Sequence, residues 1–176
     1  MTAGTGCATT IEGLRPDLVV PTQKCAVRVW HAAYDALLPA GQVEHMLAQR
    51  NSVAALESYL GAVDRWFDVA LRQSGSAATE VVGYTSGRLT SPTSARLEQI
   101  YVVPDCWGEG LAQALLDRAL ARAEDAGAER IDLTVNKANL RAQRFYARNG
   151  FALVDEVITD IGDGFVMDDY VWARPL

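Results

Sequence analysis

The stretch "PDCWGEGLAQALL", Pro104 to Leu116, decides how this chain folds. The segment before it, "RLEQIYVV", is rich in β-forming residues and ends at Pro104, which has no N–H to donate to a sheet. The Ala/Leu run after it predicts a helix from about Leu111 to Ala126, and Gly127 suits the left-handed backbone that commonly ends helices. A strand that turns through glycines into a helix indicates an α/β fold.

The turn itself has the features of an anion site. Gly108 and Gly110 allow unusual backbone angles, and the free N–H groups of a helix start attract negative charge. A mononucleotide P-loop needs Lys and then Ser or Thr after its last glycine, where this chain has Leu111 and Ala112, and a dinucleotide fingerprint needs a third glycine. Neither nucleotide class is predicted, and an ordinary helix start is an equal alternative. Glu109, between the glycines, is expected to face solvent.

Composition and charge narrow the function classes. The 176 residues fit one domain, here 1–176 with residues 1–8 expected to be flexible, and 49% of them are hydrophobic, as in ordinary globular proteins. A net charge of −6 argues against binding to nucleic acid or anionic membrane. Cys7, Cys25 and Cys106 are too few and too scattered for a disulfide framework or a zinc site. The sequence shows no signal peptide and no membrane span, which predicts a cytoplasmic protein. No bound metal is expected, because the cysteines do not form a zinc site.

The remaining segments predict alternating strands and helices. "TTIEGLR" is a short strand, an amphipathic helix runs from Pro21, and a second helical region covers residues 42–59 with a break that Ser52 can cap. "WFDVALR" and "EVVGYTSGRL" form a hairpin, and "SPTSA" is a loop. The later elements are the strand "RIDLTV", the helix "NLRAQRFYARNG", and the final strands "FALVDEVI" and "FVMDDYVWARPL".

The helix "NLRAQRFYARNG" carries a second constellation. Asn139, Ala142 and Tyr146 lie at offsets 0, 3 and 7 and therefore share one helix face. The small Ala142 leaves room for a bulky group, and the other two provide polar atoms at its ends. The alternative is that Tyr146 and Phe145 are core aromatics.

Together, "VVPDCWGEGLAQALL" and "NLRAQRFYARNGF" resemble the GNAT superfamily of N-acetyltransferases. The loop of that family ends in Gly-x-Gly/Ala, here Gly110 and Ala112, and its later motif Asn-x-x-Ala-x-x-Phe-Tyr-x-x-x-Gly-Phe is matched from Asn139 to Phe151. The resemblance implies a single-domain α/β fold. Its twisted, mostly antiparallel mixed sheet has about seven strands, with a V-shaped splay between two central parallel strands and about four flanking helices.

The resemblance also implies that acetyl-CoA is the co-substrate and enters the splay. Backbone groups of the strand end would bind the pantetheine arm, and amides of the glycine turn would bind the pyrophosphate. The residues so implied in cofactor binding are Val102, Val103, Trp107, Gly108, Glu109, Gly110, Leu111, Ala112, Asn139 and Ala142. Trp107 stands where the family has Arg or Gln, and it can stack on the cofactor or act as a hydrophobic lid.

The catalytic roles follow from the same resemblance. In the family, the Tyr at the position of Tyr146 protonates the departing sulfur, which a phenol with a pKa of about 10 can do at neutral pH. Ribosomal-protein alanine acetyltransferases carry a Glu where this chain has Thr134. Other GNAT enzymes use a carboxylate from the strand before the cofactor loop, so the resemblance implies Glu98 as the candidate base, with a surface ion pair or water-mediated proton removal as alternatives.

The acetyl acceptor is predicted from charge. Residues 155–169 hold six acids and no Lys or Arg, which favours a cationic amine held by Asp168 and Asp169, although an acidic solvated loop is an equal alternative. Trp30 and Tyr34 would shape the acceptor wall. "LEQIYVV" and "IGDGFVMDDYVW" partly resemble PaiA-type spermidine/spermine N-acetyltransferases, so a polyamine is favoured. Peptide N-termini, aminoglycosides, a non-catalytic acyl-CoA sensor and a homodimer stay open.

Overall fold

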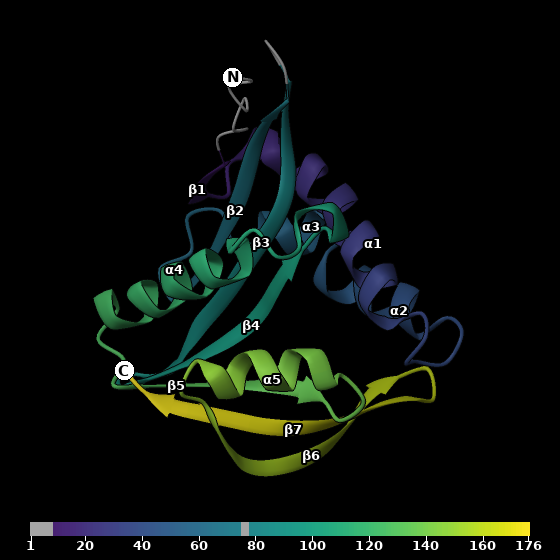
Figure 1. Ribbon diagram of the computed structural model, residues 1–176, viewed down its shortest axis with the longest axis vertical. Coiled ribbons are helices and arrows are strands. Elements are labelled where there is room, and N and C mark those ends of the chain that lie inside the picture. The colour runs from purple at the N-terminus through teal and green to yellow at the C-terminus, as the bar shows by residue number, and fades with distance from the viewer. Residues whose placement is uncertain (1–8, 75–77) are drawn as a thin grey trace, which may run out of the picture.

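The chain forms one seven-stranded sheet with helices on both faces, seen in a computed structural model that describes residues 9–74 and 78–176 (Figure 1). The sheet order is β1-β2-β3-β4-β5-β7-β6. The strands are β1 (Thr9–Gly13), β2 (Arg65–Ser74), β3 (Ala78–Ser91), β4 (Ser94–Val102), β5 (Arg130–Asn136), β6 (Ala152–Gly162) and β7 (Phe165–Pro175). The helices are α1 (Val19–Tyr34), α2 (Gln42–Arg50), α3 (Val53–Glu57), α4 (Leu111–Asp125) and α5 (Leu140–Arg148). The segment 1–8, expected to be flexible, lies outside the described residues.

The predicted splay lies between β4 and β5. These neighbours are parallel, and they pair only at Ser94–Arg96 against Arg130–Asp132. Beyond that point β4 continues along β3, while β5 pairs with β7 as far as Asn136. The sheet therefore divides into two halves, which Figure 1 shows diverging from the short paired segment. The predicted mixed sheet with a V-shaped splay is confirmed.

Helix ends follow the local chemistry predicted for them. The Ser52 side chain accepts a hydrogen bond from the Ala55 amide at 3.2 Å, and Asn139 caps α5 through the Ala142 amide at 3.1 Å. Gly127 has φ 87° just after α4. Helix α1 begins at Val19, before Pro21, because a proline in the first turn loses no intrahelical hydrogen bond. The segment "SPTSA" is only a two-residue turn, since β3 and β4 extend into it.

Two groups of buried side chains hold the helices against the sheet. One joins α1 and the first turns of α4 to β2, β3 and β4, with Trp30, Tyr84 and Leu115 fully buried. The other joins α4 and α5 to β4 and β5 through residues such as Leu116 and Leu133. Figure 1 shows α4 in front of the β2–β4 half and α5 in front of the β5–β7 half. No helix in the described parts of the chain is long and apolar enough to cross a membrane.

Candidate functional site

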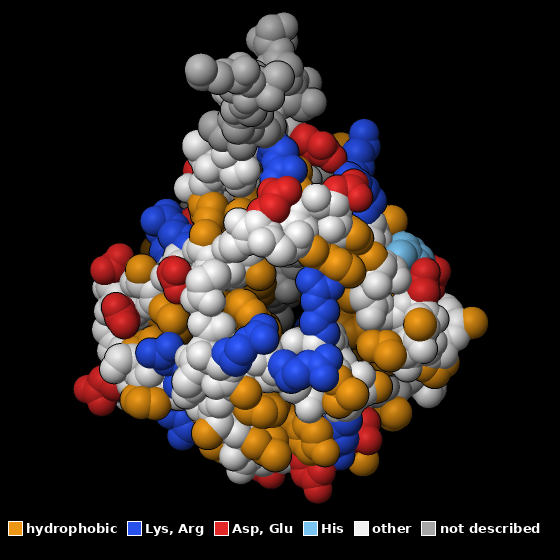
Figure 2. Space-filling model, viewed as in Figure 1, with side chains coloured by type: hydrophobic (Ala, Val, Ile, Leu, Met, Phe, Trp, Pro, Cys, Tyr) orange, Lys and Arg blue, Asp and Glu red, His pale blue; other side chains and the backbone are white. Residues whose placement is uncertain are grey.

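A cavity of about 540 Å³ fills the gap between the diverging ends of β4 and β5. Its walls come from α1, the ends of β4 and β5, and α5, so the fold brings together segments far apart in the sequence. Figure 2 shows the face that carries α4 and α5 hollowed near its centre, with Lys and Arg side chains beside the opening. The predicted site residues that line this first cavity are Tyr34, Val102, Trp107, Ala112, Asn139, Ala142 and Tyr146.

A second cavity, of about 340 Å³, lies against the glycine turn. Gly108 and Gly110 line it with φ 85° and 82°, and a Cβ at either position would meet no heavy atom within 4 Å. The first backbone hydrogen bond of α4 runs from the Ala114 amide to the Gly110 carbonyl. Within the described residues, the amides from Gly108 to Gln113 therefore have no backbone acceptor, which is the condition for binding an anion.

The carboxylate of Glu109 forms an ion pair. It contacts the guanidinium of Arg72 on β2, although nearly half of the Glu109 side chain stays exposed. This ion pair draws the negative charge of the turn toward a cation on the neighbouring strand. Leu111 is 8% exposed and packs in the core, so it can offer an anion only its amide.

Trp107 connects the turn to both sides of the splay. Its indole N–H donates to the Val102 carbonyl at 2.8 Å, and the Arg141 guanidinium lies 3.6 Å from its ring centroid. Both Trp107 and Arg141 line the two cavities, so the pair stands at the boundary between them. A guanidinium stacked on an indole is a favourable cation–π contact, which here brings a cation from α5 to the turn.

The two valines at the end of β4 differ in what their backbone can offer. The Val103 amide donates to Val82 at 2.9 Å and its carbonyl accepts from Cys106 at 3.0 Å. Val103 is also 2% exposed and lines none of the three cavities described here, so its backbone is engaged inside the protein. Val102 lines both cavities, and its carbonyl is held by Trp107.

Tyr146 extends from α5 into the first cavity. Its ring packs against Phe145 and Phe151, with centroids 5.4 and 5.5 Å away. Burial raises the pKa of the phenol above its usual value, with a smaller contribution from Tyr34. No hydrogen bond joins the Tyr146 hydroxyl to another described residue, so a protonated phenol is available to donate into the cavity.

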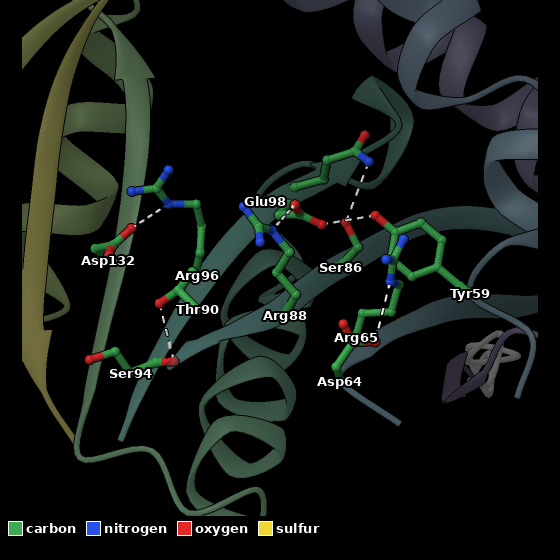
Figure 3. A network of polar contacts seen from close by, with 11 residues as sticks. Tyr59, Asp64, Arg65, Ser86, Arg88, Thr90, Ser94, Arg96, Glu98 and Asp132 are labelled. Carbon is green, nitrogen blue, oxygen red and sulfur yellow. Dashed lines mark hydrogen bonds and ion pairs between the residues drawn. The ribbon is translucent and has the colours of Figure 1, made fainter. Parts of the chain in front are cut away.

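Glu98 faces a third cavity, of about 350 Å³, between the sheet and helices α2 and α3. It is the additional residue of a β-bulge, because Leu97 pairs with Gly87 while Gln99 pairs with Ser86. Its carboxylate accepts from the Tyr59 hydroxyl at 2.9 Å and from Arg88 Nε at 3.0 Å (Figure 3). The structure thus places Glu98 away from the first cavity and gives its carboxylate two donors.

The four predicted acceptor residues lie in different surroundings. Trp30 is 1% exposed, donates to the Tyr84 hydroxyl at 3.0 Å, and sits in the core behind Tyr34. Tyr34 lines the first cavity and shares a hydrogen bond with Tyr101. Asp168 is half-exposed and pairs with Lys137 at 2.7 Å.

Asp169 is the buried acid of the C-terminal hairpin. It is 7% exposed, and its Oδ1 has no hydrogen-bond partner among the described residues. Burial raises the pKa of Asp169 to about 6, whereas the charge of Arg50 acts to lower it. Neither Asp168 nor Asp169 lines any of the three cavities.

Sequence reasoning missed several lining residues. Arg141 and Arg148 both line the first and second cavities, and they are seven residues apart on α5, the same spacing as Asn139 and Tyr146. This seven-residue spacing of the two arginines can be read from the sequence alone. The arginines of the third cavity come from four different elements, and no local pattern connects them. No group of three or more His, Cys, Asp and Glu side chains in the described part of the chain is placed to hold a metal ion.

Comparisons with known proteins agree with this architecture. The chain is 38% identical over 96 residues to an uncharacterized N-acetyltransferase of Mycobacterium bovis, a match that covers 54% of this chain and 61% of that protein. It is 29% identical over 129 residues to the aminoglycoside N(6')-acetyltransferase type 1 of Serratia marcescens, covering 73% and 87% of the two chains.

The crystal structure of the PaiA N-acetyltransferase from Thermoplasma acidophilum, in complex with coenzyme A, superposes with a TM-score of 0.79 at 18% identity. That superposition covers 96% of this chain and 99% of the other, and it shows the same fold. Residues 30–151 match the Acetyltransferase (GNAT) family. The chain therefore belongs to the GNAT family of acetyltransferases.

Proposed function

We propose that this protein is an acetyl-CoA-dependent N-acetyltransferase that acts on a primary amine. One juxtaposition carries the proposal. The unpaired amides of residues 108–113 lie at one end of the splay, and the Tyr146 hydroxyl points into the cavity that fills it. The anion site and the proton donor thus lie in two adjoining cavities with shared lining residues, which together form a channel suited to a charged carrier with a reactive distal thioester.

The residues present fit coenzyme A. The open space beside Gly108 and Gly110 and the amides up to Gln113 suit a pyrophosphate, with Arg141 and Arg148 adding positive charge. Val102 offers its backbone to the pantetheine arm, and Asn139 and Ala142 border the same channel. Val103 is not part of the proposed coenzyme A site, because its backbone hydrogen bonds are made within the protein.

The chain must supply a proton to sulfur and remove one from nitrogen. Acetyl transfer from the thioester to an amine releases a thiolate and leaves an extra proton on the nitrogen. Tyr146 is the proposed donor to the sulfur, because its phenol stays protonated at neutral pH and its O–H has no competing acceptor among the described residues. Glu98 is the proposed recipient of the amine proton, directly or through water, from the other side of the sheet.

Two observations bear on the acceptor and they point in opposite directions. The acidic C-terminal hairpin favours a polyamine or another cationic amine, and the Serratia marcescens relative is an aminoglycoside acetyltransferase. Within that hairpin, however, Glu156 and Asp168 are paired with Lys137. The other observation is the four arginines that line the third cavity, which favour an acceptor with an anionic group. An N-terminal peptide acceptor and a non-catalytic acyl-CoA sensor are the remaining alternatives.

We also propose that the protein is cytoplasmic and that it forms a homodimer through β6. This edge strand exposes Leu153, Val154 and Ile158, at 52%, 51% and 69%. An open strand edge with exposed aliphatic side chains is suited to pairing with another chain. Sedimentation equilibrium tests the dimer, and a monomer at 100 µM would contradict it.

The function is tested by calorimetry of coenzyme A binding together with thiol release from acetyl-CoA and a broad panel of amines. We expect micromolar affinity and turnover with at least one amine. Binding without turnover on any amine would establish the sensor instead. Absence of both binding and turnover would refute the acetyl-CoA proposal.

A further inference from the structure

The third cavity opens on the face of the sheet opposite α4 and α5, between α2, α3 and strands β2 to β5. Thr134 on β5 lines both this cavity and the splay cavity. The strands β4 and β5 separate just past Arg96 and Asp132, so Thr134 lies where the sheet is open. The two cavities thus meet at the splay from opposite sides. A molecule in the third cavity would approach the thioester from the side opposite the cofactor turn.

Positive charge dominates this cavity. Its lining includes four arginines, Arg50, Arg65, Arg88 and Arg96, and a single carboxylate, Glu98. The chain as a whole carries a net charge of −6, so this concentration of arginines is opposite to the overall charge. Asp64 and Asp132 pair with two of the arginines from outside the lining. Asp169, which the charge of Arg50 also reaches, lies outside the lining, so the excess of positive charge belongs to the lining itself.

The hydrogen-bonding groups of these arginines are largely unused. Arg88 donates to Glu98 only through Nε, and Arg96 donates to Asp132 only through Nε, at 2.5 Å. Arg65 approaches Asp64 no closer than 3.6 Å, which is longer than a hydrogen bond, and Arg50 has no ion pair with any described residue. Figure 3 shows the terminal nitrogens of Arg88 and Arg96 without a drawn partner. Each terminal fork can therefore donate to a bound oxyanion.

We propose that the third cavity binds the acetyl acceptor, and that the acceptor carries an oxyanion, a carboxylate or a phosphate, in addition to its amine. This inference rests on the proposed acetyl transfer. Guanidinium forks match the two oxygens of a carboxylate or phosphate, which explains why this cavity has arginines with free Nη groups. The amine end lies toward Glu98 and Thr134 at the opening between the strands.

A polyamine is a poor fit for such a cavity. Its several ammonium groups would be repelled by the arginines, and the lining offers them only one carboxylate, Glu98. A zwitterionic amine meets both signs of charge, the one carboxylate and the several guanidinium groups. The volume of about 350 Å³ suits a small molecule or the end of a peptide.

The first test compares acceptors on the full-length protein. Thiol release from acetyl-CoA is measured with α-amino acids and dipeptides, with phosphoethanolamine and amino-sugar phosphates, and with spermidine and ethanolamine. We expect the amines that carry a carboxylate or a phosphate to give kcat/KM at least tenfold above spermidine and ethanolamine, which carry neither. The carboxylate and phosphate arms distinguish the two oxyanions. Spermidine as the best acceptor would overturn the inference while leaving the acetyltransferase proposal intact.

The second test measures binding without turnover. Calorimetry with the best anionic amine is performed on the wild type, on Arg50→Gln and on the control Arg130→Gln, whose exposed side chain lies outside the three cavities. Removing a charged donor to an oxyanion is expected to weaken amine binding roughly 10- to 100-fold in Arg50→Gln, because such hydrogen bonds are among the strong ones. The control and the coenzyme A affinity of both variants should not change. Equal amine affinity in wild type and Arg50→Gln would overturn the inference, whereas loss of coenzyme A binding by the wild type would refute the proposed function.

Discussion

Replacement of Tyr146 by Phe separates the chemistry of this site from its packing. The Tyr146 ring contacts Phe145 and Phe151, and phenylalanine keeps both contacts. The hydroxyl makes no hydrogen bond within the described structure, so its loss leaves no partner unsatisfied. We therefore expect the free energy of unfolding to change by less than about 0.5 kcal/mol. Turnover should instead fall by about 10²- to 10⁴-fold, the usual contribution of a positioned acid.

The assay is steady-state thiol release from acetyl-CoA over pH 6 to 9.5, with thermal denaturation and calorimetry of coenzyme A on the same samples. The raised pKa of Tyr146 keeps its phenol protonated throughout this range, so an alkaline decline of wild-type activity below pH 9 must come from another group. We expect kcat to fall in the variant while the coenzyme A affinity and Tm stay constant. A variant with wild-type kcat would remove Tyr146 from the acid role. A fall in Tm of more than a few degrees would show that the hydroxyl has a structural partner.

Three further changes test the electrostatics. Asp68 is fully buried and accepts from Arg118 and from Arg122, at 3.0 to 3.2 Å, so Asp68→Asn should lower the free energy of unfolding by about 2–3 kcal/mol in urea denaturation; an unchanged midpoint would contradict this. The pKa of Asp169 is raised to about 6 from an ordinary value of 3.8, so its ionisation costs stability as pH rises between about 4 and 6. The free energy of unfolding of Asp169→Asn should therefore exceed that of the wild type by about 2–3 kcal/mol at pH 7.5 and equal it at pH 4. A difference that stays constant across this pH range would refute the raised pKa of Asp169. Glu109→Lys should tighten coenzyme A binding several-fold at low salt and less at 0.5 M salt, because added ions screen the charge; calorimetry that finds equal affinities at low salt would show that this position does not act on the phosphates.

The parts of the fold predicted from the sequence are those with local signals. The Asn139 cap and the glycines at 108 and 110 determine backbone conformation within a few residues, and all are found as expected. The alternating burial of β4 likewise requires only the segment itself. Such features can be inferred without knowledge of the tertiary structure.

Other features of the site depend on contacts between distant segments. The family resemblance implies Trp30 in an acceptor wall, because the N-terminal helices supply that wall in the family, yet its indole N–H donates to Tyr84 in the core. The β-bulge that places Glu98 over the third cavity results from the register between β3 and β4. The four arginines around it come from α2, β2, β3 and β4, and only the folded sheet brings them together. No pattern along the chain encodes such a set.

The position of Trp107 makes the intrinsic tryptophan fluorescence of this protein a probe of its cofactor turn. Trp107 is 44% exposed, whereas Trp30 and Trp66 are buried and Trp172 is partly buried. Its indole N–H occupies the Val102 carbonyl, and its ring carries Arg141 at the boundary between the two cavities. A ligand that enters along the glycine turn must change the environment of this ring. The intrinsic fluorescence of the unlabelled protein, and its quenching by acrylamide, will therefore report when the channel is filled, at concentrations too low for calorimetry.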